Sequence, residues 1–256
     1  MRYEILGRLR VSDGPRAATI GAQKVETLFA VLLSRPNQII SASQLMDEIW
    51  GEHIPGRAAA GIHVYTSQVR KFLTRFRGAE APIVTISPGY VFDPQDDELD
   101  YQLFERLTRL GSKHAREKRH RQAIAHFEEA LALWRGPVLI GLGLGPILSG
   151  FAVRLTESRM ECTEALIESC LTLGRHREVI GRLYSLTVEN PLREAFYRQL
   201  MLALYRSDRQ ADALKVYQTA RLTLKEELGL EPCRALQDLQ RAILSADYQA
   251  GRFRAS

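Results

Sequence analysis

Basic side chains are concentrated in one window of this sequence, and such side chains bind anions. Between Arg57 and Arg77 the chain has five Lys or Arg residues and no Asp or Glu. Guanidinium and ammonium groups bind phosphate oxygens, which position a protein on nucleic acid. In the same window Gln68 could bond adenine, and Val64 could touch a thymine methyl group. The chemistry that this window favours is recognition of double-stranded DNA.

One amphipathic helix is predicted to position these side chains. Its buried face follows the helical spacing of Ile62, Tyr65, Thr66, Val69, Phe72 and Leu73. At about 100° per residue, the opposite face collects Ala60, His63, Val64, Ser67, Lys71 and Thr74, flanked by Arg57, Gln68, Arg70 and Arg75. A run of charges can also be plain solvated surface. The absence of carboxylates and the hairpin that follows favour a DNA-binding face instead.

The elements around this helix have the order of a winged helix-turn-helix domain. Alternating apolar residues predict a strand over residues 3–11, a turn at 12–15 and a second strand over 17–20. Helices are predicted over residues 25–33 and from Ser41, which can form a capping box with Gln44, to Gly51. Ser87-Pro88-Gly89 separates two apolar runs, as in a β-hairpin. Such an α+β unit lays its third helix in the major groove and its hairpin near the adjacent backbone or minor groove.

The chain beyond the hairpin is predicted to be an all-α helical repeat. The acidic, proline-containing segment 93–100 suits a domain boundary, so we expect domains over residues 1–95 and 96–256. Val179 and Ala213 are 34 residues apart, as are Leu183 and Tyr217. That is the period of tetratricopeptide repeats, in which stacked helix pairs share a core. A loop over residues 134–146 interrupts the array.

Patterns for catalysis, metal or cofactor binding are not found in this sequence. Its histidines form no His-Glu-x-x-His pattern, Gly141-Leu142-Gly143-Leu144-Gly145 lacks the dinucleotide-binding spacing, and Cys162, Cys170 and Cys233 lack zinc spacing. We therefore expect no enzyme, no cofactor and no metal, and cysteines that serve as small core residues. No uninterrupted apolar run approaches the roughly 18 residues of a membrane span. A cytoplasmic, nucleoid-associated protein without a membrane partner is expected.

Several short motifs together resemble the Streptomyces antibiotic regulatory protein family. Those that resemble its OmpR-like DNA-binding domain are Gly21-Ala22-Gln23-Lys24, Glu48-Ile49-Trp50-Gly51, Ile62-x-x-Tyr65-x-Ser67-x-Val69-Arg70-Lys71-x-Leu73 and Ser87-Pro88-Gly89-Tyr90. Those similar to its bacterial transcriptional activation domain are Trp134-Arg135-Gly136-Pro137, Leu173-Gly174-Arg175-His176, Asn190-Pro191-Leu192-Arg193-Glu194, Ala203-Leu204-Tyr205-Arg206, Arg209-Gln210-x-Asp212-Ala213-Leu214 and Glu226-Glu227-Leu228-Gly229-x-Glu231-Pro232. The resemblance covers about residues 2–247 and depends on the order and spacing of these motifs.

The resemblance implies a transcriptional activator of a secondary-metabolite, or antibiotic, gene cluster. Such proteins bind direct repeats near the promoter's −35 region and recruit RNA polymerase holoenzyme with its sigma factor. A homodimer on DNA is expected from paired repeats. Larger relatives append an ATPase or phosphopeptide-binding domain, whereas this sequence ends at Ser256. We therefore expect control through the protein's own expression, without a phosphorelay like that of two-component systems.

The candidate DNA-contacting residues come from the third helix, the ends of the first two helices and the hairpin. They are Lys24, Ser41, Ser43, Arg57, His63, Val64, Ser67, Gln68, Arg70, Lys71, Arg75 and Ser87. We expect Arg57, Arg70, Lys71 and Arg75 to contact phosphates. For Lys24, Ser41 and Ser43, helix capping or solubility is an equal alternative. Gln68 stands where many relatives carry arginine, so their base preference does not carry over.

Two further interpretations remain open from the sequence. A second basic stretch, residues 113–121, could contact DNA or polymerase, or be a solvated segment between helices. The whole chain could instead be a helical-repeat adaptor whose winged helix binds protein, because that fold does not by itself determine function. Salt dependence separates these functions, since phosphate contacts make binding to DNA strongly salt-dependent.

Overall fold

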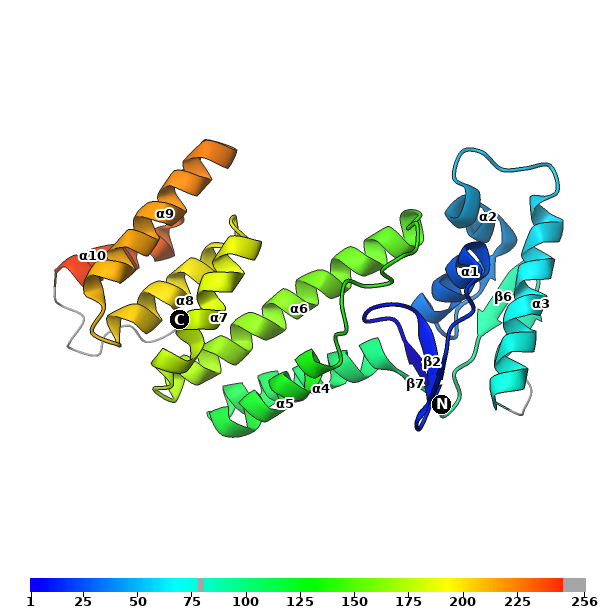
Figure 1. The fold of residues 1–256 in the computed structure, drawn as a ribbon, viewed down its shortest axis with the longest axis horizontal. Helices are drawn as coiled ribbons and strands as arrows, with labels where there is room; N and C mark the ends of the chain where they lie inside the picture. The colour runs from blue at the N-terminus through cyan, green and yellow to red at the C-terminus, as the bar shows by residue number, and fades with distance from the viewer. Residues whose placement is uncertain (78–80, 246–256) are drawn as a thin grey trace. The chain divides into compact units, whose positions relative to one another are not determined.

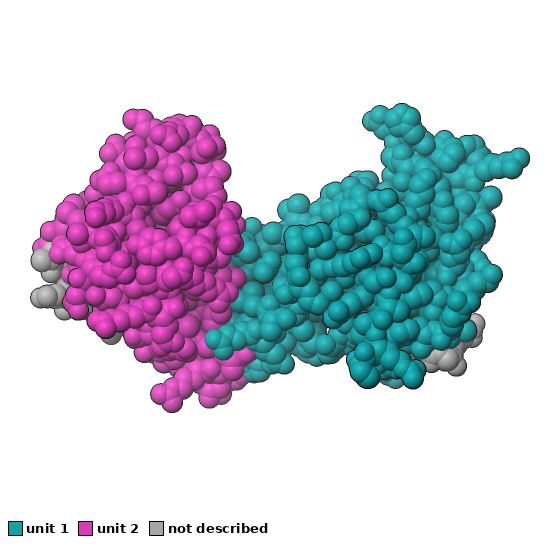
Figure 2. Space-filling view, viewed as in Figure 1, with its two compact units in different colours: residues 1–110, 126–162 teal, residues 111–125, 163–256 magenta. Residues whose placement is uncertain are grey.

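The structure is a computed structural model that describes residues 1–77 and 81–245 (Figure 1). Packing divides the chain into two compact units, residues 1–110 with 126–162 and residues 111–125 with 163–256 (Figure 2). This division does not follow the boundary expected at residues 95 and 96. The reason is that residues 100–110 and 126–162 pack with the N-terminal part of the chain.

The first unit begins with a small sheet of four strands. They are β1 (Arg2–Glu4), β2 (Arg10–Asp13), β3 (Arg16–Ala18) and β7 (Glu98–Leu99), in the order β3-β2-β1-β7, with β7 parallel to β1. The strand expected over residues 3–11 is wrong, because the chain reverses there and Glu4 pairs with Arg10. Ile5, Leu6 and Leu9 are buried in this reversal. Strand β7 lies in the segment that the sequence indicated as a boundary.

Three helices follow, and their positions confirm the helical periodicity. They are α1 (Gln23–Ser34), α2 (Ala42–Trp50) and α3 (Ala58–Arg77). Ser41 and Gln44 form the predicted capping box at the start of α2. The rings of Tyr3, Phe29 and Phe92 meet edge to face, with centroids 5.0 to 6.1 Å apart. This fully buried cluster joins the first sheet, α1 and the hairpin region in one core.

The predicted hairpin is confirmed and belongs to a second sheet. Its strands are β5 (Ile83–Ile86) and β6 (Gly89–Phe92), and β6 also pairs with β4 (Ile40–Ser41). The sheet order is β4-β6-β5, so β5 is an edge strand. A Cβ atom on Gly89 would lie 1.9 Å from the carbonyl oxygen of Ile40. Only glycine therefore permits this pairing of β4 with β6.

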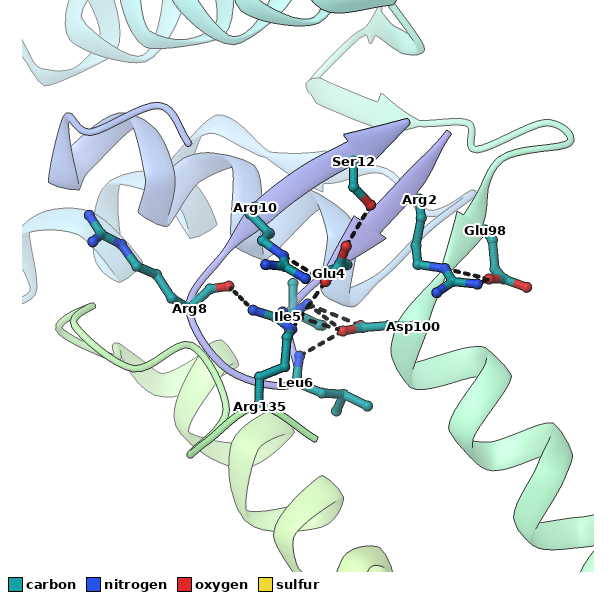
Figure 3. A network of polar contacts seen from close by, with 10 residues as sticks. All are labelled: Arg2, Glu4, Ile5, Leu6, Arg8, Arg10, Ser12, Glu98, Asp100 and Arg135. Carbon is teal, nitrogen blue, oxygen red and sulfur yellow. Dashed lines mark hydrogen bonds and ion pairs between the residues drawn. The ribbon is translucent and has the colours of Figure 1, made fainter. Parts of the chain in front are cut away.

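Three long helices follow the two sheets: α4 (Asp100–Arg116), α5 (His120–Ala132) and α6 (Pro146–Thr172). The start of α4 and the loop after α5 are bonded to the N-terminal sheet (Figure 3). The Asp100 carboxylate accepts hydrogen bonds from the backbone N–H groups of Ile5 and Leu6 at 2.9 to 3.0 Å. Arg135 forms an ion pair with Glu4 at 3.0 Å and donates to the carbonyl of Arg8 at 3.1 Å.

A second polar contact joins α2 to the start of α6. The Glu48 carboxylate accepts hydrogen bonds from the backbone N–H groups of Ile147 at 2.7 Å and Leu148 at 3.0 Å. These N–H groups belong to the first helical turn, which lacks intrahelical partners, and the negative charge suits the positive end of the helix dipole. Glu48 is only 5% exposed. It is therefore a cap for α6 supplied by another helix.

The second unit is helical, as the 34-residue period predicts. Its later helices are α7 (His176–Glu189), α8 (Glu194–Tyr205), α9 (Gln210–Leu228) and α10 (Arg234–Leu244). Helix α8 packs against α7, α9 and α10. Cys170 is buried in this unit and Cys162 in the first, as expected, but Cys233 is exposed at the N-cap position of α10, where its side chain forms no capping hydrogen bond. Across residues 1–77 and 81–245, no helix has the length and apolarity to cross a membrane.

Candidate nucleic-acid interface

Helix α3 separates apolar and polar side chains as its sequence predicts. Ile62, Val69 and Leu73 are buried, at 1% exposure or less, and the helix packs on α1 and α2. The opposite side is exposed and consists of Ala60, His63, Val64, Ser67, Gln68, Lys71, Thr74 and Arg75. The exposed side contains no carboxylate. It is therefore a continuous polar and cationic helix face, long enough to lie along a groove of DNA.

Three cations on or next to this face have no acidic partner among the described residues. Within residues 1–77 and 81–245, no Asp or Glu forms an ion pair with Arg57, Lys71 or Arg75. Arg10, by comparison, is paired with Glu4 at 2.7 Å in the same unit. Unpaired cations keep their full attraction for phosphate, and Arg57 precedes the positive N-terminus of α3. These three side chains can therefore bind the DNA backbone.

Two side chains on the same face have the chemistry to contact base edges. Val64 is 52% exposed, so its methyl groups are accessible to a partner. Gln68 is exposed one helical turn later, so the two lie one above the other. A glutamine amide can bond adenine at N6 and N7, and valine methyl groups can contact the methyl group of thymine. Ser67 lies beside them and can donate to either a base or a phosphate.

Lys24, at the start of α1, lies over an aromatic pair that supports α3. Its ammonium group is 5.2 Å from the centroid of the Trp50 ring, and that ring stacks on Tyr65 at 5.9 Å. The Lys24 side chain remains exposed, and its contact with DNA stays a prediction. The support given by Trp50 and Tyr65 is not predicted by the sequence, although both residues belong to motifs that resemble the DNA-binding domain.

The three serines of the candidate set have different surroundings. The Ser41 hydroxyl accepts a hydrogen bond from the Gln44 N–H at 3.2 Å and lies 2.9 Å from the Ser43 hydroxyl. The capping alternative for Ser41 is therefore confirmed. Ser43 is exposed on the first turn of α2, and Ser87 is exposed in the turn between β5 and β6. DNA contacts by these serines stay predictions.

His63 and Arg70, by contrast, are bonded to the hairpin. The Nδ1 atom of His63 lies 2.7 Å from the Tyr90 hydroxyl. Arg70 donates to the carbonyl of Ile83 and to the hydroxyl of Thr85. These hairpin partners are not predicted by the sequence, because a helix pattern shows which side of the helix a residue occupies and not which neighbour it contacts. The available signal was the seven-residue spacing of His63 and Arg70, which places both on one flank of α3.

The second basic stretch lies where α4 ends and α5 begins, in the second unit. Arg119 forms an ion pair with Glu117, whereas Lys113, Arg116 and Lys118 are exposed. A contact with DNA or polymerase there stays a prediction. In the part of the chain that the structure describes, no three His, Cys, Asp or Glu side chains gather as a metal site requires. Hence the polar face of α3 is the candidate site that the geometry supports best.

Comparisons with known proteins assign both parts of the chain. The family model for the "Transcriptional regulatory protein, C terminal" matches residues 20–92. The model for the "Bacterial transcriptional activator domain" matches residues 99–244, which is more than half of the chain. The first match contains α3 and the hairpin, and the second contains the helices from α4 to α10.

Similar proteins have the same two parts. The regulatory protein DnrI of Streptomyces peucetius is 35% identical over 253 residues, covering 96% of this chain and 93% of that protein. AfsR of Streptomyces coelicolor is 38% identical, but the chain spans only 24% of its length. The structure of Mycobacterium tuberculosis EmbR in complex with a low-affinity phosphopeptide matches with a TM-score of 0.91 at 33% identity, covering 96% of this chain and 65% of EmbR.

These matches identify a winged-helix DNA-binding domain of the OmpR type followed by a helical activator domain. DnrI, AfsR and EmbR are all named as regulatory proteins, and EmbR as a transcriptional one. The chain belongs to the Streptomyces antibiotic regulatory protein family and is a transcriptional activator of that type.

Proposed function

We propose that this protein activates a secondary-metabolite, or antibiotic, gene cluster by binding direct repeats near the −35 region of its promoter. It recruits RNA polymerase holoenzyme, including the sigma factor, to that promoter. Two copies bind as a homodimer on DNA. Repeats about one helical turn apart, roughly 34–36 Å, would place both copies on the same face of the duplex.

The observation that carries this proposal is the exposed face of α3. It has three cations without a described acidic partner and, between them, the exposed side chains of Val64 and Gln68. In the proposed complex Arg57, Lys71 and Arg75 bind phosphates and set the position of the helix. Gln68 and Val64 then face the base edges in the major groove, where A·T pairs are distinguishable by their donors, acceptors and methyl groups.

The helical part supports the activator role through its family. Residues 99–244 match the bacterial transcriptional activator domain. Stacked helix pairs present extended surfaces that suit protein partners. We therefore assign the polymerase contact to this part of the chain and the promoter contact to α3 and the hairpin.

The test is footprinting of the full chain on its own gene neighbourhood, at low and at moderate salt, with and without RNA polymerase holoenzyme. We expect protection of tandem repeats that weakens with salt and strengthens when polymerase is added. A parallel transcription assay should show more transcript only from promoters that contain the repeats. Absence of protection at low salt would contradict the proposal and favour a protein-binding adaptor.

A further inference from the structure

One flank of α3 is hydrogen-bonded to the hairpin. The Nε and Nη2 atoms of Arg70 lie 3.1 and 2.9 Å from the carbonyl oxygen of Ile83. Nη2 also lies 2.8 Å from the Thr85 hydroxyl. Arg70 is half-buried, whereas its neighbour Lys71 is exposed. Adjacent cations on one helix therefore have different surroundings and different partners.

The hydrogen bonds from Arg70 give a partner to a backbone carbonyl group on an edge strand of the second sheet. Strand β5 is the last strand in the order β4-β6-β5, and among the described residues it pairs on the β6 side alone. An edge strand has outward-facing carbonyl and N–H groups without a strand partner, and such edges are normally covered. The guanidinium group of Arg70 supplies two donors to the carbonyl of Ile83. Its planar fork makes this arrangement specific to arginine, because lysine has a single nitrogen.

His63 forms a second bond between α3 and the hairpin. Its Nδ1 atom lies 2.7 Å from the Tyr90 hydroxyl, and the two rings meet edge to face at 6.2 Å. His63 and Arg70 are seven residues apart, about two helical turns, so they lie on the same flank. Thr85 and Tyr90 are cross-strand partners in the hairpin. Two bonds from successive parts of α3 thus reach neighbouring positions of one hairpin.

We propose that Arg70 and His63 are positioning residues that hold the hairpin against α3, so that the two elements meet DNA as one preformed unit. The inference rests on the proposed binding of DNA by α3. If Arg70 turned to a phosphate, it would give up its bonds to Ile83 and Thr85. If it stays in place, no counterion is released on its account, and its contribution to affinity is the preorganisation of the hairpin.

The salt dependence of binding separates these two roles. The slope of log K against log salt reflects the number of phosphates that are contacted, about 0.9 per contact. For the full chain on the footprinted site, we expect Arg70→Ala to weaken binding about tenfold without changing the slope. Lys71→Ala serves as the matched control and should make the slope less steep by about 0.9. A loss of slope in Arg70→Ala equal to that in Lys71→Ala would overturn the proposal.

Conservative variants give a second criterion. Arg70→Lys keeps the positive charge but not the planar fork, so it should remain impaired, whereas rescue to wild-type affinity would mean a phosphate contact. Thr85→Val and Tyr90→Phe each remove one hydroxyl and leave the rest of the hairpin intact. Each should weaken binding several-fold at unchanged slope. Wild-type affinity in both of these variants and in Arg70→Ala would overturn the positioning role.

A measurement without DNA distinguishes failure of this inference from failure of the proposed function. In the free protein, Arg70→Ala should accelerate amide hydrogen exchange in β5 while urea unfolding remains cooperative. Unchanged exchange in β5 would overturn the positioning role even if the wild type binds DNA. If the wild type and Lys71→Ala both fail to bind DNA at low salt, the proposed function fails instead. The hydrogen-exchange result then still tests the bonds between Arg70 and β5.

Discussion

At the scale of single residues, the cations of α3 differ because their partners differ. Arg57, Lys71 and Arg75 have no described acidic partner, whereas Arg70 is bonded to the hairpin. A hydrogen bond to a charged group contributes about 1.5–3 kcal/mol. A side chain that already has such bonds gains little by exchanging them for a phosphate. The unpaired cations are therefore the side chains whose loss should change the electrostatics of binding.

Lys71→Ala tests the phosphate role of the α3 face. Because ammonium–phosphate contacts are insensitive to base sequence, we expect affinity for specific and non-specific DNA to fall by similar factors. The slope of log K against log salt should decrease by about 0.9. Fluorescence anisotropy at several salt concentrations measures both quantities. Lys215→Ala, a lysine on α9 that is 81% exposed, is the matched control and should bind like wild type. An unchanged slope in Lys71→Ala would contradict this placement of α3.

At the scale of elements, the hairpin depends on how closely β4 and β6 approach. Gly89 on β6 faces the backbone of Ile40 and Ser41, which belong to β4 and to the cap of α2. The same short segment thus pairs with the hairpin and starts the second helix. The hairpin sequence alone predicts its turn, but this close approach follows from the packing of distant strands.

Gly89→Ala should destabilise the protein. The added Cβ atom would lie 1.9 Å from the Ile40 carbonyl oxygen and 2.7 Å from the Ser41 Cα atom, and backbone atoms cannot move aside cheaply. We expect a loss of about 2–4 kcal/mol in the free energy of unfolding, measured by urea denaturation. Gly150→Ala on α6 meets no atom within 4 Å and should be slightly stabilising. Equal unfolding midpoints for Gly89→Ala and wild type would show that this backbone contact is wrong.

At the scale of the whole molecule, the first unit combines residues from both predicted domains. Glu48 caps α6, Asp100 accepts hydrogen bonds from the backbone of the loop after β1, and Arg135 forms an ion pair with Glu4. Burial tends to raise the pKa of Glu4, but hydrogen bonds from Ser12 and Arg10 outweigh it, so its pKa is lowered overall. These buried polar contacts bind the start of the helical region to the DNA-binding part.

Glu48→Gln tests the cap that joins α2 to α6. The amide keeps one acceptor oxygen but loses the negative charge and turns an NH2 group towards N–H donors. We expect a loss of about 1–3 kcal/mol in the free energy of unfolding. Hydrogen exchange should accelerate at the amides of Ile147 and Leu148. Glu52→Gln, in the exposed loop after α2, is the control and should change neither quantity. Unaltered protection of both amides in Glu48→Gln would exclude the cap.

Asp100 predicts a pH dependence of stability. Burial raises its pKa to about 6, although the N–H groups of Ile5 and Leu6 and the charge of Arg135 oppose the rise. Because the pKa of Asp100 in the folded protein lies above its ordinary value of 3.8, the contribution of Asp100 to stability is fully present below pH 3.8. The contribution is then lost as pH rises through about 6.

The comparison that isolates this residue is wild type against Asp100→Asn. Between pH 5 and pH 7.5, the wild type should lose about 1 kcal/mol of unfolding free energy relative to the variant. Urea denaturation at both pH values measures the difference. Asp13→Asn, at the exposed end of β2, is the control, and its unfolding free energy should change with pH as that of the wild type does. A difference that is independent of pH, or of opposite sign, would contradict the raised pKa.

Local sequence patterns determined much of this protein. The two faces of α3, the capping box at Ser41 and the hairpin turn were all predicted from residues close together in the chain. Such features follow from helix and strand geometry and from turn chemistry, which act over a few residues. The family motifs then placed these elements in a known order.

Only the tertiary structure decided which polar side chains are hydrogen-bonded to distant parts of the chain and which are exposed to solvent. Arg70 meets Ile83 across 13 positions, Asp100 meets Ile5 across 95, and Arg135 meets Arg8 across 127. Periodicity assigns a residue to a face but does not name the neighbour on that face. Long-range packing brings those neighbours together, and it therefore distinguishes the exposed cations of α3 from Arg70, which is hydrogen-bonded to the hairpin.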